Sequence, residues 1–183
     1  PCAFQWCSNL MEIKICSTVE SIGFNAFDSC NSLAKVEFEL SSSLPHNHQL
    51  KTIDNGAFRG CFSLQRIKPP SSVNTIGTSA FKKCIALVEA SLSTASITEI
   101  PGYCFSHCRS LQTVSLPNSL ERIGDEAFDR CTSLVTVIAP LDDSHPIKIG
   151  VKSFAGCSAL ANLVLPQGSN AMEDSFAECT KLQ

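Results

Sequence analysis

The sequence has little charge, no basic excess and few aromatic residues other than phenylalanine. Charged residues make up 17% of its 183 residues, the net charge is −3, and there is one Trp and one Tyr. Because a nucleic-acid binder needs clustered Lys and Arg, this balance argues against nucleic acid as a partner. No apolar run reaches the roughly eighteen residues of a transmembrane segment. Gly-rich phosphate loops, Gly-x-Ser-x-Gly elbows and Cys-x-x-Cys pairs are also missing, so no catalytic, cofactor or metal residues are predicted.

Phenylalanine and cysteine, by contrast, are abundant, with eleven copies of each. In eight places Phe is followed by Cys three residues later, and by Leu three residues after that. The eight phenylalanines are Phe4, Phe27, Phe58, Phe81, Phe105, Phe128, Phe154 and Phe176. The basic spacing is 23 residues, as between Phe4 and Phe27, and insertions at 39–50 and 141–147 lengthen two copies. An internal repeat of this length predicts a solenoid of stacked coils.

Each part of the repeat predicts a local structure. Phe, Cys and Leu at a spacing of three suggest a short helical or 3₁₀ turn whose inner face repeats every three residues. The following Val-x-Leu pattern alternates like a half-buried strand, and the Gly after Ile in Ile123-Gly124 suggests a tight corner with positive φ. One coil cannot bury its own apolar side. We therefore expect about eight coils, stacked as one domain over residues 1–183, with a parallel β-sheet along one face.

The repeat unit resembles that of the BspA-like leucine-rich repeat family. It reads Ile-Gly-x-x-Ala-Phe-x-x-Cys-x-x-Leu-x-x-Val-x-Leu-Pro, and residues 124–134 are a near-consensus copy. The resemblance covers almost the whole chain and implies a leucine-rich-repeat solenoid, a right-handed superhelix of the α/β type. It also implies a surface-exposed adhesin or protein-binding module of bacteria or protists. The family shares no catalytic residues, so none is carried over to this sequence.

The cysteines of the repeat are interpreted as buried free thiols. Their shared position beside Phe and Leu faces the core, and free Cys packs as a small hydrophobe. Neighbouring Cα atoms are close enough for disulfides, but parallel side chains do not converge as a disulfide or a zinc site requires. Outside this position we expect Cys104 in the core, and Cys2 and Cys16 in outward positions. His46, His48, Asp142, Asp143 and His145 lie in the two insertions and are expected to be solvated loop residues.

The outward positions of the predicted strands change character along the chain. The early strands carry charges of alternating sign, such as Lys14, Glu37 and Lys68, which are expected to pair across coils. The later strands are uncharged, and their outward residues form the candidate protein-contact surface: Thr113, Ser115, Thr136, Ile138, Asn162 and Val164. An uncharged, partly apolar stripe is a reasonable contact site. The alternative is that Thr, Ile and Val are there as good strand formers.

Two functions fit these observations. The first is a non-catalytic module, adhesin-like or surface-associated, that binds a protein through its strand face and the inserted loops. The second is a structural subunit inside a larger assembly, in which case the protein is intracellular. The chain opens inside a repeat at Pro1 and ends just after a repeat Leu. We therefore expect the natural protein to be longer, or other parts of a complex to pack against the two ends.

Overall fold

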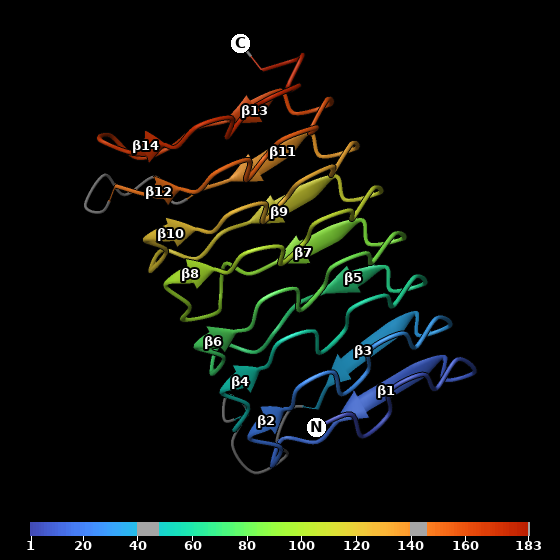
Figure 1. The fold of residues 1–183 in the computed structure, drawn as a ribbon. Helices are drawn as coiled ribbons and strands as arrows, with labels where there is room; N and C mark the ends of the chain where they lie inside the picture. Colours follow the sequence, from blue (N-terminus) through green and yellow to red (C-terminus); the bar gives the residue numbers. More distant parts are fainter. Residues whose placement is uncertain (40–47, 140–145, 183) are drawn as a thin grey trace.

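A computed structural model describes residues 1–39, 48–139 and 146–182. The chain forms a β-solenoid whose coils stack along one axis, from the N-terminal coil in blue to the C-terminal coil in red (Figure 1). The longer strands form one row: β1 (Glu12–Ile15), β3 (Lys35–Phe38), β5 (Arg66–Ile67), β7 (Glu89–Ser91), β9 (Thr113–Ser115), β11 (Thr136–Ile138) and β13 (Asn162–Leu163). From β1 to β13 the chain completes six turns of the solenoid. One copy of the Phe motif precedes β1 and one follows β14, so eight copies make fewer complete turns than the eight predicted.

A second row of strands lies beside the first, where the sequence predicted only a corner. It consists of two-residue strands: β2 (Ser21–Ile22), β4 (Thr52–Ile53), β6 (Thr75–Ile76), β8 (Glu99–Ile100), β10 (Arg122–Ile123), β12 (Lys148–Ile149) and β14 (Asn170–Ala171). All strand pairs are parallel and pair equivalent residues, for example Ile123 with Ile100 and Ile149. Since a two-residue strand has no visible alternation, the period-two pattern could not reveal this row.

The segments from Phe to Leu are not helical, which corrects the predicted helical or 3₁₀ turn. Within the described residues there is no α-helix or 3₁₀-helix. Hydrogen bonds do join residues three apart, such as Cys30 N–H to the Phe27 carbonyl at 3.1 Å and Leu33 N–H to the Cys30 carbonyl at 3.0 Å. However, the residue two positions after each Phe has a positive φ, as at Ser29 (60°) and Arg130 (55°). A left-handed residue interrupts a right-handed helical run, so consecutive β-turns form instead.

Positive φ also occurs two residues before each Phe, mostly at residues other than glycine, such as Asn25 and Glu126. This backbone is costly, since a left-handed conformation costs roughly 1–2 kcal/mol for such a residue. The left-handed conformation turns alternate N–H groups toward the next coil. Phe27 N–H donates to the Ala57 carbonyl and Ser29 N–H to the Arg59 carbonyl, at 2.8 and 2.7 Å. We call this set of bonds between coils the turn ladder. Its hydrogen bonds offset the backbone strain.

The side chains that face inward fill one continuous core. The repeat phenylalanines stack in parallel from coil to coil, with ring centroids 5.1–5.5 Å apart. Phe58, Phe81, Phe105, Phe128 and Phe154 are fully buried, as are most of the Leu and Ile of the repeat. Burying each such side chain contributes roughly 1.5–3 kcal/mol. The core therefore depends on stacking between neighbouring coils, as predicted.

The glycine after each Ile has a different role from the predicted one. Gly77, Gly124 and Gly150 do not have positive φ. Neighbouring coils approach so closely there that a Cβ on Gly124 would lie 2.7 Å from the Gly102 nitrogen, and one on Gly77 would lie 2.3 Å from the Asn55 nitrogen. These contacts are to backbone atoms, which cannot swing aside. Glycine is therefore needed for close approach of the coils.

Both strand rows are interrupted where the repeat is irregular. Hydrogen bonding joins β1 to β3 and β5 through β13, but β3 and β5 do not pair. In the second row β6 and β8 do not pair. The strand before Pro69-Pro70, β5, has two residues, because proline has no N–H to continue the pairing. Among the described residues, no helix has the length and apolar character needed to cross a membrane.

Candidate protein-contact surface

The first strands of the longer row carry ion pairs on their outward face. The Lys14 Nζ lies 2.9 Å from the Glu39 carboxylate in the next coil, Lys35 pairs with Glu37 in its own strand, and Arg66 reaches Glu89 across coils at 3.9 Å. All of these side chains are largely exposed, so each pair contributes about 0–1 kcal/mol. Pairing across coils was predicted from the alternating signs. It occurs for Lys14 and Arg66 but not for Lys35.

The later strands bring the six predicted contact residues into two columns. Thr136 pairs with Thr113 on one side and with Asn162 on the other, and Ile138 pairs with Ser115. Val164 follows directly after the end of β13. Ile138 and Val164 are 53% and 69% exposed, whereas Thr113, Ser115 and Thr136 are half-buried. The surface is therefore a strip of hydroxyl and amide groups with two exposed β-branched side chains at its end.

The second insertion is one of the two loops that were expected to take part in partner binding. Its residues Asp142, Asp143 and His145 lie outside the described residues, as does His46 of the first insertion. His48 is described, and it is buried, which corrects its interpretation as a solvated loop residue. Its Nδ1 accepts the Leu50 N–H at 3.1 Å, and its ring meets Phe38 edge-on with the centroids 5.9 Å apart. Packing against Phe38 keeps this imidazole out of water.

The cysteines make hydrogen bonds that the sequence did not suggest. The Sγ of Cys108 donates to the Phe81 carbonyl of the preceding coil at 3.2 Å, and the other thiols of this position from Cys30 to Cys179 do the same. All cysteines are free, and Cys2 and Cys16 are exposed as predicted. Cys7 is also exposed, which corrects its predicted burial. A thiol at this position thus fills space and bonds two coils.

Burial keeps these thiols protonated. It raises the pKa of Cys84 above its ordinary value, raises those of Cys104, Cys108 and Cys131 well above it, and raises the pKa of the half-buried Cys179 to about 11. Nucleophilic attack and metal binding require the thiolate. The buried thiols are accordingly unreactive, and the described residues contain no group of three His, Cys, Asp or Glu that could hold a metal ion.

One cluster on the turn side has the residue types of a hydrolytic triad, and sequence reasoning missed it. The His107 Nδ1 lies 2.9 Å from the Ser106 Oγ and 3.6 Å from the Asp129 Oδ2. Burial lowers the pKa of His107 and raises the pKa of Asp129. In a catalytic relay the serine and the carboxylate engage opposite ring nitrogens. Here both approach Nδ1 and Ser106 is buried, so the geometry does not form that relay.

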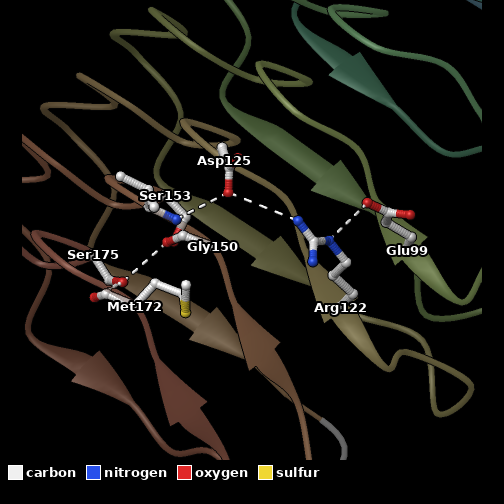
Figure 2. A network of polar contacts seen from close by, with 8 residues as sticks. Glu99, Arg122, Asp125, Gly150, Ser153, Met172 and Ser175 are labelled. Carbon is white, nitrogen blue, oxygen red and sulfur yellow. Dashed lines mark hydrogen bonds and ion pairs between the residues drawn. The ribbon is translucent and has the colours of Figure 1, made fainter.

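A network along the second strand row joins four coils (Figure 2). Arg122 lies 3.1 Å from Glu99 of the preceding coil and 3.8 Å from Asp125 of its own, and the Asp125 Oδ1 accepts the Val151 N–H of the next coil. The Gly150 carbonyl then accepts the hydroxyls of Ser153 and Ser175, both at 3.0 Å. Glu99–Arg122, Asp125–Val151 and Gly150–Ser175 each link neighbouring coils, whereas the Ser153 hydroxyl bonds within its own coil. We therefore interpret this network as structural.

The family models and the solved structures that match this chain are both of leucine-rich repeat proteins. The BspA type leucine rich repeat region matches in six copies, over residues 1–45, 40–145 and 142–183. Among solved structures, the chain is similar to the leucine-rich repeat protein TpLRR of T. pallidum, with 31% identity and a TM-score of 0.73, over 87% of this chain and 69% of that one. By sequence, no curated protein matches it.

Two longer structures are also similar. A leucine-rich repeat protein from Eubacterium ventriosum shares 25% identity with a TM-score of 0.77, over 92% of this chain and 42% of its own. A leucine-rich cell surface protein from Faecalibacterium prausnitzii shares 30% identity with a TM-score of 0.59, over 84% of this chain and 47% of its own. The chain thus spans less than half the length of these two relatives. Because the repeat region matches along nearly its whole length, the chain belongs to the BspA type leucine-rich repeat family.

Proposed function

We propose that this chain is a non-catalytic protein-binding module, surface-associated and adhesin-like, whose strand face binds a protein partner along β9, β11 and β13. The observation that carries the proposal is the exposure of Ile138 and Val164 beside an uncharged strip of strand residues. The cell-surface location is suggested by the similar leucine-rich cell surface protein of F. prausnitzii.

Physical reasons favour the later strands over the earlier ones. A partner that covers β1, β3 or β5 has to desolvate or break the ion pairs of Lys14, Lys35 and Arg66. The free energy this costs can exceed the free energy gained from the new contacts. Thr113, Thr136 and Asn162 carry no charge, so covering them has no such penalty. Burying Ile138 and Val164 contributes up to about 1.5–3 kcal/mol each.

The experiment screens the purified chain against an array of extracellular and cell-surface proteins, then measures each hit by surface plasmon resonance. The test variant is Ile138→Glu with Val164→Lys, and the matched control is Lys14→Glu with Lys68→Glu. We expect the test pair to abolish binding because it places charges in the apolar contact. Loss of binding in the control pair, with full binding in the test pair, would place the contact on the charged strands instead.

A further inference from the structure

The turn side of the middle coils gathers positive charge, although the chain as a whole has a net charge of −3. Its outward positions carry five cations: Arg59, Lys82, Lys83, Arg109 and Arg130, which we call the cationic ridge. The turn ladder places their coils side by side, since Gly60 N–H donates to the Lys82 carbonyl and Lys83 N–H to the Ser106 carbonyl, both at 2.8 Å. The ridge therefore runs across neighbouring coils.

The carboxylates near the ridge are occupied or shielded. Asp28 is buried and takes both arms of Arg59, with Nε–Oδ1 and Nη2–Oδ2 distances of 3.0 and 2.8 Å. Asp129 is mostly buried beside His107. Within the described ranges, Lys82, Lys83, Arg109 and Arg130 form no ion pair. Lys82 instead lies over the Tyr103 ring, with Nζ 4.4 Å from the centroid, and the Tyr103 hydroxyl donates to the Glu126 carboxylate at 3.1 Å.

Apolar side chains adjoin these cations. Phe62 and Ile85 are 42% and 41% exposed and occupy the same position of successive coils, where Ala86 N–H donates to the Phe62 carbonyl at 3.1 Å. Phe62 also lines a groove of about 390 Å³ together with Arg59, Lys82 and Lys83. The groove thus offers cations and exposed hydrocarbon within one surface.

We propose that this groove and the cationic ridge bind an extended acidic peptide segment of a protein partner, one that carries apolar side chains beside its carboxylates. The carboxylates pair with Lys82 and Lys83, which have no internal ion pair to give up. The apolar side chains cover Phe62 and Ile85, whose burial adds to the affinity. A sulfated polysaccharide would match the charges, but it has no apolar side chain for Ile85.

This surface is separate from the one in the proposed function. Phe, Cys and Leu of the turn segments and the inward Ile and Val of the strands face one shared core. The outward residues of the turns and of the strands therefore belong to different sides of the solenoid. Substitutions at Ile138 and Val164 should leave peptide binding unchanged, so each proposal can fail without the other.

The test uses a fluorescein-labelled synthetic peptide of Asp and Glu interspersed with Leu, and reads binding by fluorescence anisotropy. A second peptide replaces Leu by Ser, and a labelled sulfated oligosaccharide serves as the competing probe. The test variant is Lys82→Gln with Lys83→Gln. The matched control is Lys51→Gln with Lys68→Gln, two exposed lysines in strand-side positions of the third coil.

We expect the test pair to weaken binding of the Leu peptide about tenfold, as two partly exposed ion pairs warrant, and raised salt to weaken it further. The control pair should change it less than about twofold. Ile85→Ser and the Ser peptide should each lower affinity, which a purely ionic contact would not show. Absence of peptide binding, equal effects of both lysine pairs, or a preference for the oligosaccharide would overturn the proposal.

Discussion

From Phe4 to Phe176 the interactions between coils repeat without interruption on the turn side of the solenoid. On its strand side, the hydrogen bonding between strands is interrupted within both rows. The stacked phenyl rings, the thiol–carbonyl bonds and the turn ladder continue across both insertions: Ser29 N–H still donates to Arg59, and Arg130 N–H to Ala155. On the strand side, pairing stops between β3 and β5 and between β6 and β8.

This difference teaches which part of the repeat holds the coils together. The turn side needs Phe, Cys and left-handed residues at fixed positions, and every described copy supplies them. The strand side tolerates Pro69-Pro70, an insertion or a change of surface charge, because the turn side still joins the coils there. Outward strand residues are therefore free to vary with the partner, as in other repeat proteins.

The largest effect should come from emptying the turn side of one coil. Phe128→Ala should lower the free energy of unfolding by about 3–5 kcal/mol, the usual cost of deleting a buried phenyl ring. The matched change on the strand side, Val137→Ala, removes two methyl groups and should cost about 1–2 kcal/mol. Urea denaturation of both variants compares them directly. Equal losses would mean that the two sides contribute alike.

Alkaline pH should destabilise the turn side, where the buried thiols lie. The folded-state pKa values of Cys84, Cys104, Cys108 and Cys131 lie above their ordinary value of 9.0. The stability they contribute is fully present below pH 9. It falls as pH rises further, because the unfolded chain releases thiol protons that the folded chain retains.

The expected slope is about 1.4 kcal/mol per thiol for each pH unit. Denaturation from pH 8 upward measures it, and Cys104→Ala is the matched variant, since Ala occupies this position in most coils. That variant should show a shallower decline. An identical pH dependence in both proteins would show that Cys104 stays ionisable in the fold.

The glycine corner should show a moderate effect. Gly124→Ala forces a methyl group against the Gly102 backbone and should cost about 2–3 kcal/mol, as for other overpacked sites. Gly102→Ala serves as the control, because its nearest contact would be 3.2 Å, from the Asp125 carbonyl. Thermal melting separates the two. A tolerated Gly124→Ala would mean that the coils can move apart there.

The smallest change in stability is expected on the strand face. Ile138→Glu with Val164→Lys should alter the free energy of unfolding by less than about 1 kcal/mol, because both side chains are exposed. Denaturation should show this while the same pair removes partner binding. A large loss of stability would show instead that Ile138 and Val164 support the fold.

The inward residues could be predicted from the sequence, because spacing alone assigns Phe, Cys and Leu to one core and Ile123 or Val137 to another part of it. The turn type could not be predicted. A spacing of three suits both a 3₁₀ turn and two consecutive β-turns, and the deciding left-handed residues are often Lys, Arg or Glu, such as Lys83 and Arg130. These residues carry no turn signal of their own.

Of the two proposed contact surfaces, one could be predicted from the sequence and the other could not. The uncharged strip on β9, β11 and β13 follows from alternation along a strand, so its register was predictable. The cationic ridge escaped notice because Lys82, Lys83 and Arg109 are far from Arg130 in sequence and because the outward positions of a β-turn were assigned to a helix. The thiol–carbonyl bonds were also missed, since they depend on the distance between coils.

Hydrogen exchange by NMR tests most directly whether the turn side holds the coils together. In the third coil, the Phe58 and Gly60 N–H groups donate to the next coil at 2.8 Å, while the Gln65 N–H makes a 3.3 Å bond at the interrupted strand row. The account predicts that Phe58 and Gly60 exchange only through extensive unfolding, and that Gln65 and Ile67 exchange much faster through local opening. Equal or stronger protection at Gln65 and Ile67 would contradict it.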